Sequence, residues 1–203
     1  MTTQLEQVLS AIDDINRQDL NITISEGEQY PKELIYGQRM TACLTQHWPQ
    51  ASELLQIAVR AQHIKRWHLK RNEFEQGKAG YYQWRIALGK FHAALTAEIM
   101  TEEGYSKEQG EQTASIICKE NLKNKTSSQL NSDSQTLEDV ACLVFLEHYF
   151  DEFADKYLKQ DNEAKIIRIV QLTWKKMSED AHNIALQFSL PNHLADLVNK
   201  ALS

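Results

Sequence analysis

The chain has 203 residues, of which 42% are hydrophobic and 25% charged, so it is long enough to bury one globular core. Its net charge of −6 argues against a protein that coats nucleic acid, and no apolar run approaches the roughly 20 residues that cross a bilayer. The first residues lack the basic-then-apolar pattern of a signal peptide, so we expect a cytoplasmic protein without membrane contact.

Apolar residues recur at helical spacing from the N-terminus onward, as in Leu5, Val8 and Ile12. The expected helices cover residues 3–18, 31–46, 51–65, 81–102, 106–122, from about 136 onward, 163–187 and 190–202. Few Gly and Pro interrupt the chain, which also favours helices. We therefore predict an all-α protein with about seven to eight helices in one domain, 1–203.

Polar stretches separate some of these helices. Residues 67–79 predict a loop, and the Ser/Asn/Lys-rich residues 121–135 predict a mobile one. The run from Thr136 to Asp139 fits a capping box at the start of the next helix. Residues 21–25 alternate like a strand, but the segment is short and alone, so no sheet is expected.

Cations are concentrated between residues 60 and 90, where eight Lys/Arg face only two Glu. This segment sums to +6, and the rest of the chain therefore to −12. A basic island in an acidic protein can attract a small anionic ligand. The run from Arg60 to Trp67 also holds a His and two further cations, Lys65 and Arg66, at the end of an apolar helix, where buried charge needs a partner.

Helical spacing points one polar residue inward from each of four helices. These residues are His63, His92, Glu120 and Asp139. Imidazole and carboxylate together suit Mn, Fe, Ni, Co or Zn, so the four are candidate metal ligands. Each also has an ordinary interpretation: a hydrogen-bonded core histidine, a helix-end charge, or, for Asp139, a helix cap.

The segment from Gly77 to Arg85 is the second candidate binding feature. Two glycines precede a helix start, which favours anions, and Tyr82 and Trp84 offer rings on which a base can stack. The alternative is a loop followed by aromatic core residues.

Several long stretches resemble an uncharacterised family, domain of unknown function 4202. They lie at residues 60–67, 80–85, 91–92, 119–123, 135–150 and 173–178. More distantly, the order of features resembles the HD phosphohydrolase superfamily. That resemblance implies an orthogonal helical bundle with a core at about 30–160, on which helices 3–18 and 163–202 pack, and a divalent metal held over a phosphoester.

This resemblance implies a metal-dependent phosphohydrolase acting on a nucleotide or another small phosphoester. In it, the four candidate ligands hold the metal. The expected catalytic residues are His63, Arg60, Lys65, Arg66, Arg85 and Lys119. Of these, Arg60, Lys65, Arg66 and Arg85 hold the phosphate. The ligand is also contacted by Arg39, Trp67, Tyr82 and Trp84.

Two other functions stay open, because no adjacent His-Asp pair occurs in the chain and the superfamily's first histidine has no clear counterpart near Tyr36 and Arg39. One is a non-catalytic module that binds a nucleotide or phosphate. The other is a helical adaptor that binds protein through its aromatic surface. We expect a small phosphorylated partner rather than nucleic acid, and a homo-oligomer also stays open.

Overall fold

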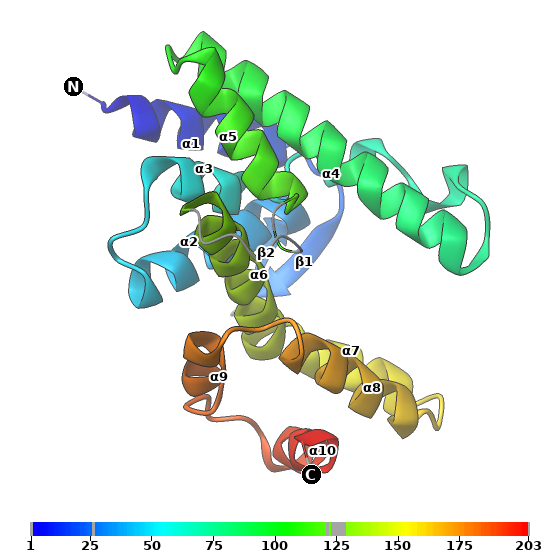
Figure 1. Ribbon diagram of the computed structural model, residues 1–203. Coiled ribbons are helices and arrows are strands. Elements are labelled where there is room, and N and C mark those ends of the chain that lie inside the picture. Colours follow the sequence, from blue (N-terminus) through cyan, green and yellow to red (C-terminus); the bar gives the residue numbers. More distant parts are fainter. Residues whose placement is uncertain (1, 26, 121, 123–128, 203) are drawn as a thin grey trace. The chain divides into compact units, whose positions relative to one another are not determined.

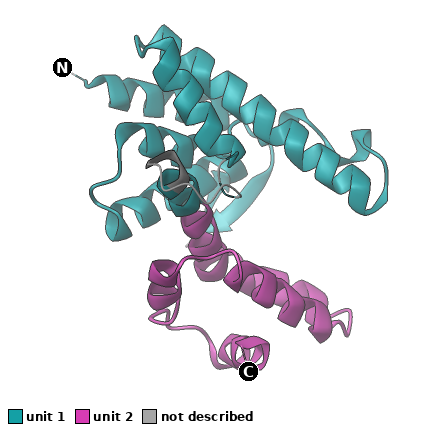
Figure 2. Ribbon diagram, viewed as in Figure 1, with its two compact units in different colours: residues 1–137 teal, residues 138–203 magenta. Residues whose placement is uncertain are grey.

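The computed structural model of the protein describes residues 2–25, 27–120, 122 and 129–202 (Figure 1). It forms two compact units, Met1–Leu137 and Glu138–Ser203, which we call unit 1 and unit 2 (Figure 2). That the whole chain is one domain with a core at about 30–160 stays a prediction. No described helix has both the length and the apolar character needed to cross a membrane.

Helices make up most of both units, which confirms the all-helical class. Unit 1 contains α1 (Gln4–Asn16), α2 (Lys32–His47), α3 (Glu53–Ala61), α4 (Gly77–Glu102), α5 (Lys107–Cys118) and the 3₁₀ turns η1 (Arg66–His68) and η2 (Arg71–Glu73). Helix α6 (Gln129–His148) crosses the boundary between the units. Unit 2 adds α7 (Phe150–Leu158), α8 (Glu163–Trp174), α9 (Glu179–Ala185) and α10 (Asn192–Leu202).

The described residues thus form ten α-helices, more than the seven or eight predicted. Phe150–Leu158 is a separate helix after α6. The single helix expected at 163–187 divides into α8 and α9 because Ser178 caps the second of them, its side chain accepting a hydrogen bond from the Ala181 amide.

Unit 1 is held together by α3, which packs against α1, α2, α4 and α5. Helix α3 starts where the Ser52 side chain accepts a hydrogen bond from the Leu55 amide, and Leu55, Ile57 and Val59 are buried along it. Helices α4 and α5 lie side by side (Figure 1). Because α3 is central, the residues that follow it are fixed against several helices at once.

A β-hairpin precedes α2, and the prediction of no strand was wrong. Strand β1 (Ile22–Ser25) pairs antiparallel with β2 (Glu28–Pro31), and Ile22 lies opposite Pro31. The Asp19 carboxylate accepts hydrogen bonds from the Asn21 amide at 2.9 Å and from the Glu33 amide at 3.2 Å. These bonds fix the start of α2, where Glu33 lies in the first turn.

The predicted start of the sixth helix was also wrong. Helix α6 begins at Gln129, so residues 129–135 are helical rather than part of a loop, and the other residues of that loop, Leu122 apart, lie outside the described residues. The Thr136 hydroxyl donates to the Ser132 carbonyl oxygen at 3.0 Å, a bond typical of the middle of a helix. The proposed capping box at Thr136 is therefore absent.

Candidate functional site

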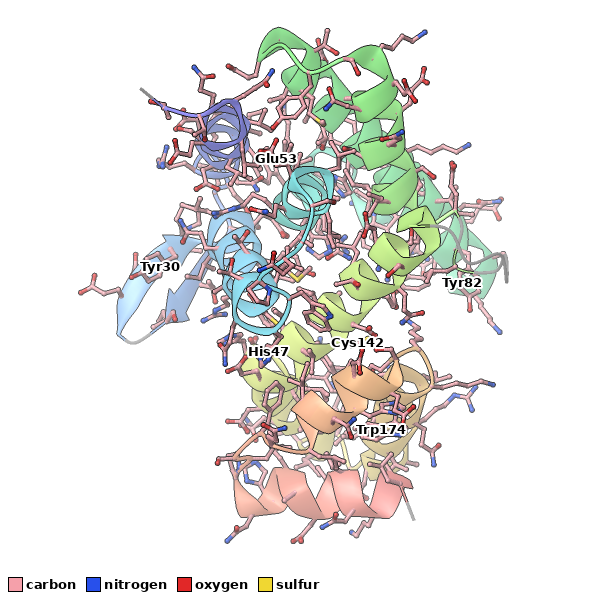
Figure 3. All side chains as sticks on the ribbon, turned by 60° about the vertical axis from the view of Figure 1, so that its left-hand side comes forward. Tyr30, His47, Glu53, Tyr82, Cys142 and Trp174 are labelled. Atoms are coloured by element: carbon pink, nitrogen blue, oxygen red, sulfur yellow. The ribbon has the colours of Figure 1, made fainter. Side chains whose placement is uncertain are left out.

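A pocket of about 310 Å³ lies in unit 1, between the residues that follow α3, the N-terminal half of α4 and the end of α5. Its lining residues are Gln62, His63, Arg66, Tyr82, Arg85, Ile86, Leu88, Gly89, Lys90, His92, Ile117, Cys118, Lys119 and Glu120. Spacing on α4 explains much of this set, because Tyr82, Arg85, Gly89 and His92 recur every three or four residues and so share one face. Figure 3 shows Tyr82 on α4, on the opposite side of unit 1 from Tyr30 of the hairpin.

His63 is fixed in orientation by two neighbours. Its Nδ1 lies 3.1 Å from Glu33 Oε2, and its ring stacks on Tyr36 with a centroid separation of 4.1 Å and an interplanar angle of 14°. Since a carboxylate can only accept, the geometry assigns the proton to Nδ1 and leaves the lone pair on Nε2. The side chain is 24% exposed and lines the pocket, so Nε2 is the ring nitrogen left for a ligand.

The electrostatic surroundings of His63 keep its ring neutral. Burial lowers the pKa of His63 well below its usual value, and the nearby cations Arg66, Arg85 and Lys119 lower it further. A neutral imidazole at physiological pH can accept a proton.

Glu33 is the partner that the sequence interpretation missed. Only 7% of the residue is exposed, and burial raises the pKa of its carboxyl, an effect that Arg66 opposes. Arg66 Nε lies 4.0 Å from Glu33 Oε1. The sequence pattern could have shown that Glu33 is buried. Glu33 shares a helical stripe with the buried residues Gly37, Met40 and Leu44, which places it on the inner face of α2.

His92 is the second imidazole of the pocket. Its ring centroid is 6.2 Å from that of His63, and its Nδ1 donates to the Ile64 carbonyl oxygen at 2.7 Å. Nε2 is buried and has no hydrogen-bond partner among the described residues. Burial and then the neighbouring His63 lower the pKa of His92 to about 3, so this ring is also neutral.

Four cationic side chains line the pocket: Arg66, Arg85, Lys90 and Lys119. The Arg66 guanidinium lies over the Trp84 ring, 4.9 Å from its centroid, and Trp84 Nε1 donates to the Leu69 carbonyl oxygen at 3.0 Å. Trp84 therefore supports Arg66 from outside the lining. Of the lining residues that the structure describes, only Glu120 is acidic.

Lys119 has an unusual backbone for its residue type. It ends α5 in the left-handed conformation, with φ of 55°, and its amide donates to the Ile116 and Ser115 carbonyl oxygens. Glycine commonly occupies such a position because a Cβ is disfavoured there. A lysine at this point puts a cation on the pocket wall at some cost in stability.

Five predicted ligand contacts lie outside the pocket lining: Trp84, described above, and Arg39, Arg60, Lys65 and Trp67. Arg60 pairs with Asp13 of α1 at 3.3 Å, and Arg39 Nη2 donates to Ser25 Oγ of the hairpin at 2.8 Å. The backbone of Lys65 is in the left-handed conformation, and its amide donates a hydrogen bond to the Asn16 side chain at 2.9 Å. Trp67 lies in η1. Arg60 Nη1 and Arg39 Nη2 are used in contacts within the fold, which indicates structural roles for these two residues.

The three proposed metal ligands that belong to unit 1 do not form a preformed set. His63, His92 and Glu120 line the pocket, but among the described residues they form no group of three ligand atoms within 4.8 Å of one another. Asp139 belongs to unit 2, where its two carboxylate oxygens accept from the Ser178 amide at 2.8 Å and the Ser178 hydroxyl at 2.6 Å. These bonds anchor the start of α9.

One group of described residues in unit 2 does satisfy that spacing: Asp151, Asp155 and His193. All three are exposed, and His193 Nε2 lies 3.1 Å from Asp151 Oδ1. Lys159 also pairs with Asp155 at 3.8 Å. The cluster is explained by ion pairs on the surface and adds nothing to the pocket.

Comparison with known proteins places the chain in a family. The family model described as domain of unknown function (DUF4202) matches residues 6–198. The chain belongs to the DUF4202 family. No curated protein and no solved structure matches it. Since the description of DUF4202 names no activity, function has to be argued from the pocket.

Proposed function

We propose that the pocket of unit 1 binds a small phosphorylated ligand such as a nucleotide. One observation carries this proposal: among the described residues, four cationic side chains and one acidic residue, Glu120, line the pocket, in a chain of net charge −6. Cations gathered in a concave site focus the field on an anion. Both histidines there are neutral, so the guanidinium and ammonium groups supply the positive charge.

The chemistry of these cations suits phosphate in particular. A guanidinium donates two parallel hydrogen bonds to a phosphate, and Arg66 and Arg85 offer two such groups. The volume of about 310 Å³ matches the lower end of small-molecule sites. Tyr82 is 53% exposed, so its ring is available for stacking with a base.

The finer architecture stays part of this proposal. We propose that the helices of unit 1 form a degenerate relative of the HD phosphohydrolase bundle. Such a scaffold would keep a phosphate site after losing the His-Asp pair. Support comes from the position of the pocket, which is walled by the residues after α3 and by the helix of His92, as the sequence resemblance implies.

Thermal unfolding with added ligands tests the proposal. Phosphate, pyrophosphate and nucleotides at a concentration of 100 Kd should stabilise the native protein by about 2.7 kcal/mol, which raises the Tm. Arg85→Gln should abolish most of the shift, because it removes a pocket cation and leaves the helix intact. Lys107→Gln is the matched control, since Lys107 is exposed on α5 and pairs only with Glu111 among the described residues. No shift with any phosphate compound, or equal shifts in both variants, would contradict the proposal.

A metal-dependent phosphohydrolase is the second candidate. The observation in its favour is His92 Nε2, a buried imidazole nitrogen that has no hydrogen-bond partner among the described residues. A metal ion is one group that could bind it. The ligand spacing above argues against a preformed site, so this candidate needs side chains to move. Elemental analysis of protein purified without chelator tests it. A stoichiometric Mn, Fe, Ni, Co or Zn content that His92→Gln removes would support it, and metal-free protein would contradict it.

A further inference from the structure

The Glu33–His63 pair has the arrangement of a general-base dyad. Glu33 Oε2 accepts a hydrogen bond from His63 Nδ1, 3.1 Å away, and the opposite ring nitrogen, Nε2, is left for the cationic pocket that the side chain lines. In hydrolases that use a carboxylate and an imidazole, the carboxylate fixes the tautomer and orientation of the ring while Nε2 takes the proton. The same division of roles is possible here with groups already in contact.

The position of Glu33 argues that the pair has a purpose beyond stability. A carboxylate that is 7% exposed loses much of its hydration, and a single pair with His63 and a 4.0 Å contact with Arg66 compensate this incompletely. The stack on Tyr36 adds a second constraint on the same ring. Two constraints on one imidazole are typical of a side chain that must present Nε2 in a fixed direction.

We infer that unit 1 hydrolyses a phosphoester without a metal, with His63 Nε2 as general base and Glu33 as the residue that positions it. This inference rests on the proposed phosphate site. His63 Nε2 accepts a proton from a water molecule while the water oxygen forms a bond to phosphorus. The bond from phosphorus to the ester oxygen breaks, its electron pair stays on that oxygen, and His63 returns the proton to it. The products are an alcohol and phosphate.

The cations of the pocket have a defined part in this step. Negative charge on the phosphoryl oxygens increases as the water attacks, and Arg66, Arg85 and Lys119 line the same pocket as His63. Binding and proton transfer are therefore supplied by separate groups, which allows an experiment to separate them.

Phosphate release from p-nitrophenyl phosphate and a panel of nucleotides, measured in the presence of EDTA, tests the inference. Wild-type protein should release phosphate, and His63→Ala should lose about 10²-fold or more of the rate. Added imidazole should restore part of the activity of His63→Ala, because it can enter the space left by the ring. His193→Asn is the control, since it removes an exposed imidazole of unit 2.

Phosphate binding is measured on the same variants by thermal shift. If wild type and His63→Ala bind phosphate equally and neither releases it from any compound in EDTA, the inference is overturned and the proposed binding function stands. If phosphate does not bind at all, the proposed function itself fails. Activity that EDTA abolishes also overturns the inference and supports the metal-dependent candidate.

Glu33 needs a readout that a purely structural role would not change. Glu33→Gln keeps a side chain that can hydrogen-bond, but its amide NH₂ can donate to Nδ1 and so favour the wrong tautomer. We expect kcat to fall with KM nearly unchanged, and the low-field proton NMR signal of the His63 Nδ1–H to disappear. Glu33→Asp should recover part of kcat. Equal loss of kcat in both variants, with the NMR signal retained, contradicts the positioning role.

Discussion

At the scale of one residue, Lys119 combines a strained backbone, which lowers stability, with a cation on the pocket wall. Its left-handed backbone, with φ of 55°, disfavours a Cβ, yet a lysine is placed there on the pocket wall. Strained conformations of non-glycine residues are concentrated at functional sites. The same chain has an exposed counterpart in unit 2, Asp161, with φ of 52°.

Replacing Lys119 by glycine should separate the two effects. Lys119→Gly relieves the strain and should raise the free energy of unfolding by about 1 kcal/mol, while the loss of the ammonium group reduces the Tm shift produced by phosphate. Chemical denaturation and thermal shift on the same samples measure both. Asp161→Gly should give the gain in stability without the loss of phosphate response. If Lys119→Gly keeps the full response, Lys119 takes no part in binding.

At the scale of one helix, two of the three glycines of α4 lie in very different surroundings. A Cβ added at Gly80 would lie 2.0 Å from the Glu75 carbonyl oxygen, whereas a Cβ at Gly89 would meet nothing within 4 Å. The close approach at Gly80 lets the chain before α4 fold back onto the helix. The open space at Gly89 leaves room in the pocket, of which Gly89 is a lining residue.

Alanine substitutions should therefore have opposite effects at these two positions. Gly80→Ala forces the backbone at Glu75 to move and should destabilise the protein by about 1–3 kcal/mol. Gly89→Ala removes a flexible residue from a helix interior and should stabilise it by up to about 1 kcal/mol. Denaturant titration of both variants beside wild type measures the difference. Equal stability of the two variants would mean that the close approach at Gly80 is absent in solution.

At this scale the sequence predicted helices well and their boundaries poorly. Periodic apolar residues identify most helices, because burial on one face requires that spacing. The hairpin at 22–31 was missed because four-residue strands give too few alternations to recognise, and their partner is set by pairing rather than by local preference. The early start of α6 was missed because Ser, Asn and Gln favour loops, and tertiary contacts overrode that preference.

The candidate site was predicted in part. His63, His92 and Glu120 line the pocket, as their inward spacing on separate helices suggested. Arg60 was assigned to the ligand because its neighbours in sequence are cationic, but it pairs with Asp13, 47 residues away. Contacts between distant segments of the chain decide such cases, and a single sequence does not give them.

At the scale of the whole molecule, the lowered pKa values of His92 and His63 determine how the free energy of unfolding changes as the pH falls. The pKa of His92 is about 3 in the folded protein, compared with about 6.5 for an exposed histidine, and that of His63 is lowered as well. Between these two values the unfolded chain binds more protons than the folded one, so stability is lost as the pH falls below about 6.5. Glu33 acts in the opposite direction, because its raised pKa lets the folded state take up a proton earlier than the unfolded chain.

We expect two histidines to outweigh one carboxyl, so that the free energy of unfolding falls by an amount on the order of a few kcal/mol between pH 7 and pH 4.5. Urea titrations across this range measure the fall. His92→Gln keeps a donor for the Ile64 carbonyl oxygen but cannot titrate, so its stability should depend less steeply on pH than that of wild type. His193→Asn, which changes an exposed ring, should follow the wild-type curve. Parallel curves for wild type and His92→Gln would show that His92 has the same pKa in the folded and unfolded states, which contradicts a lowered pKa of the buried ring.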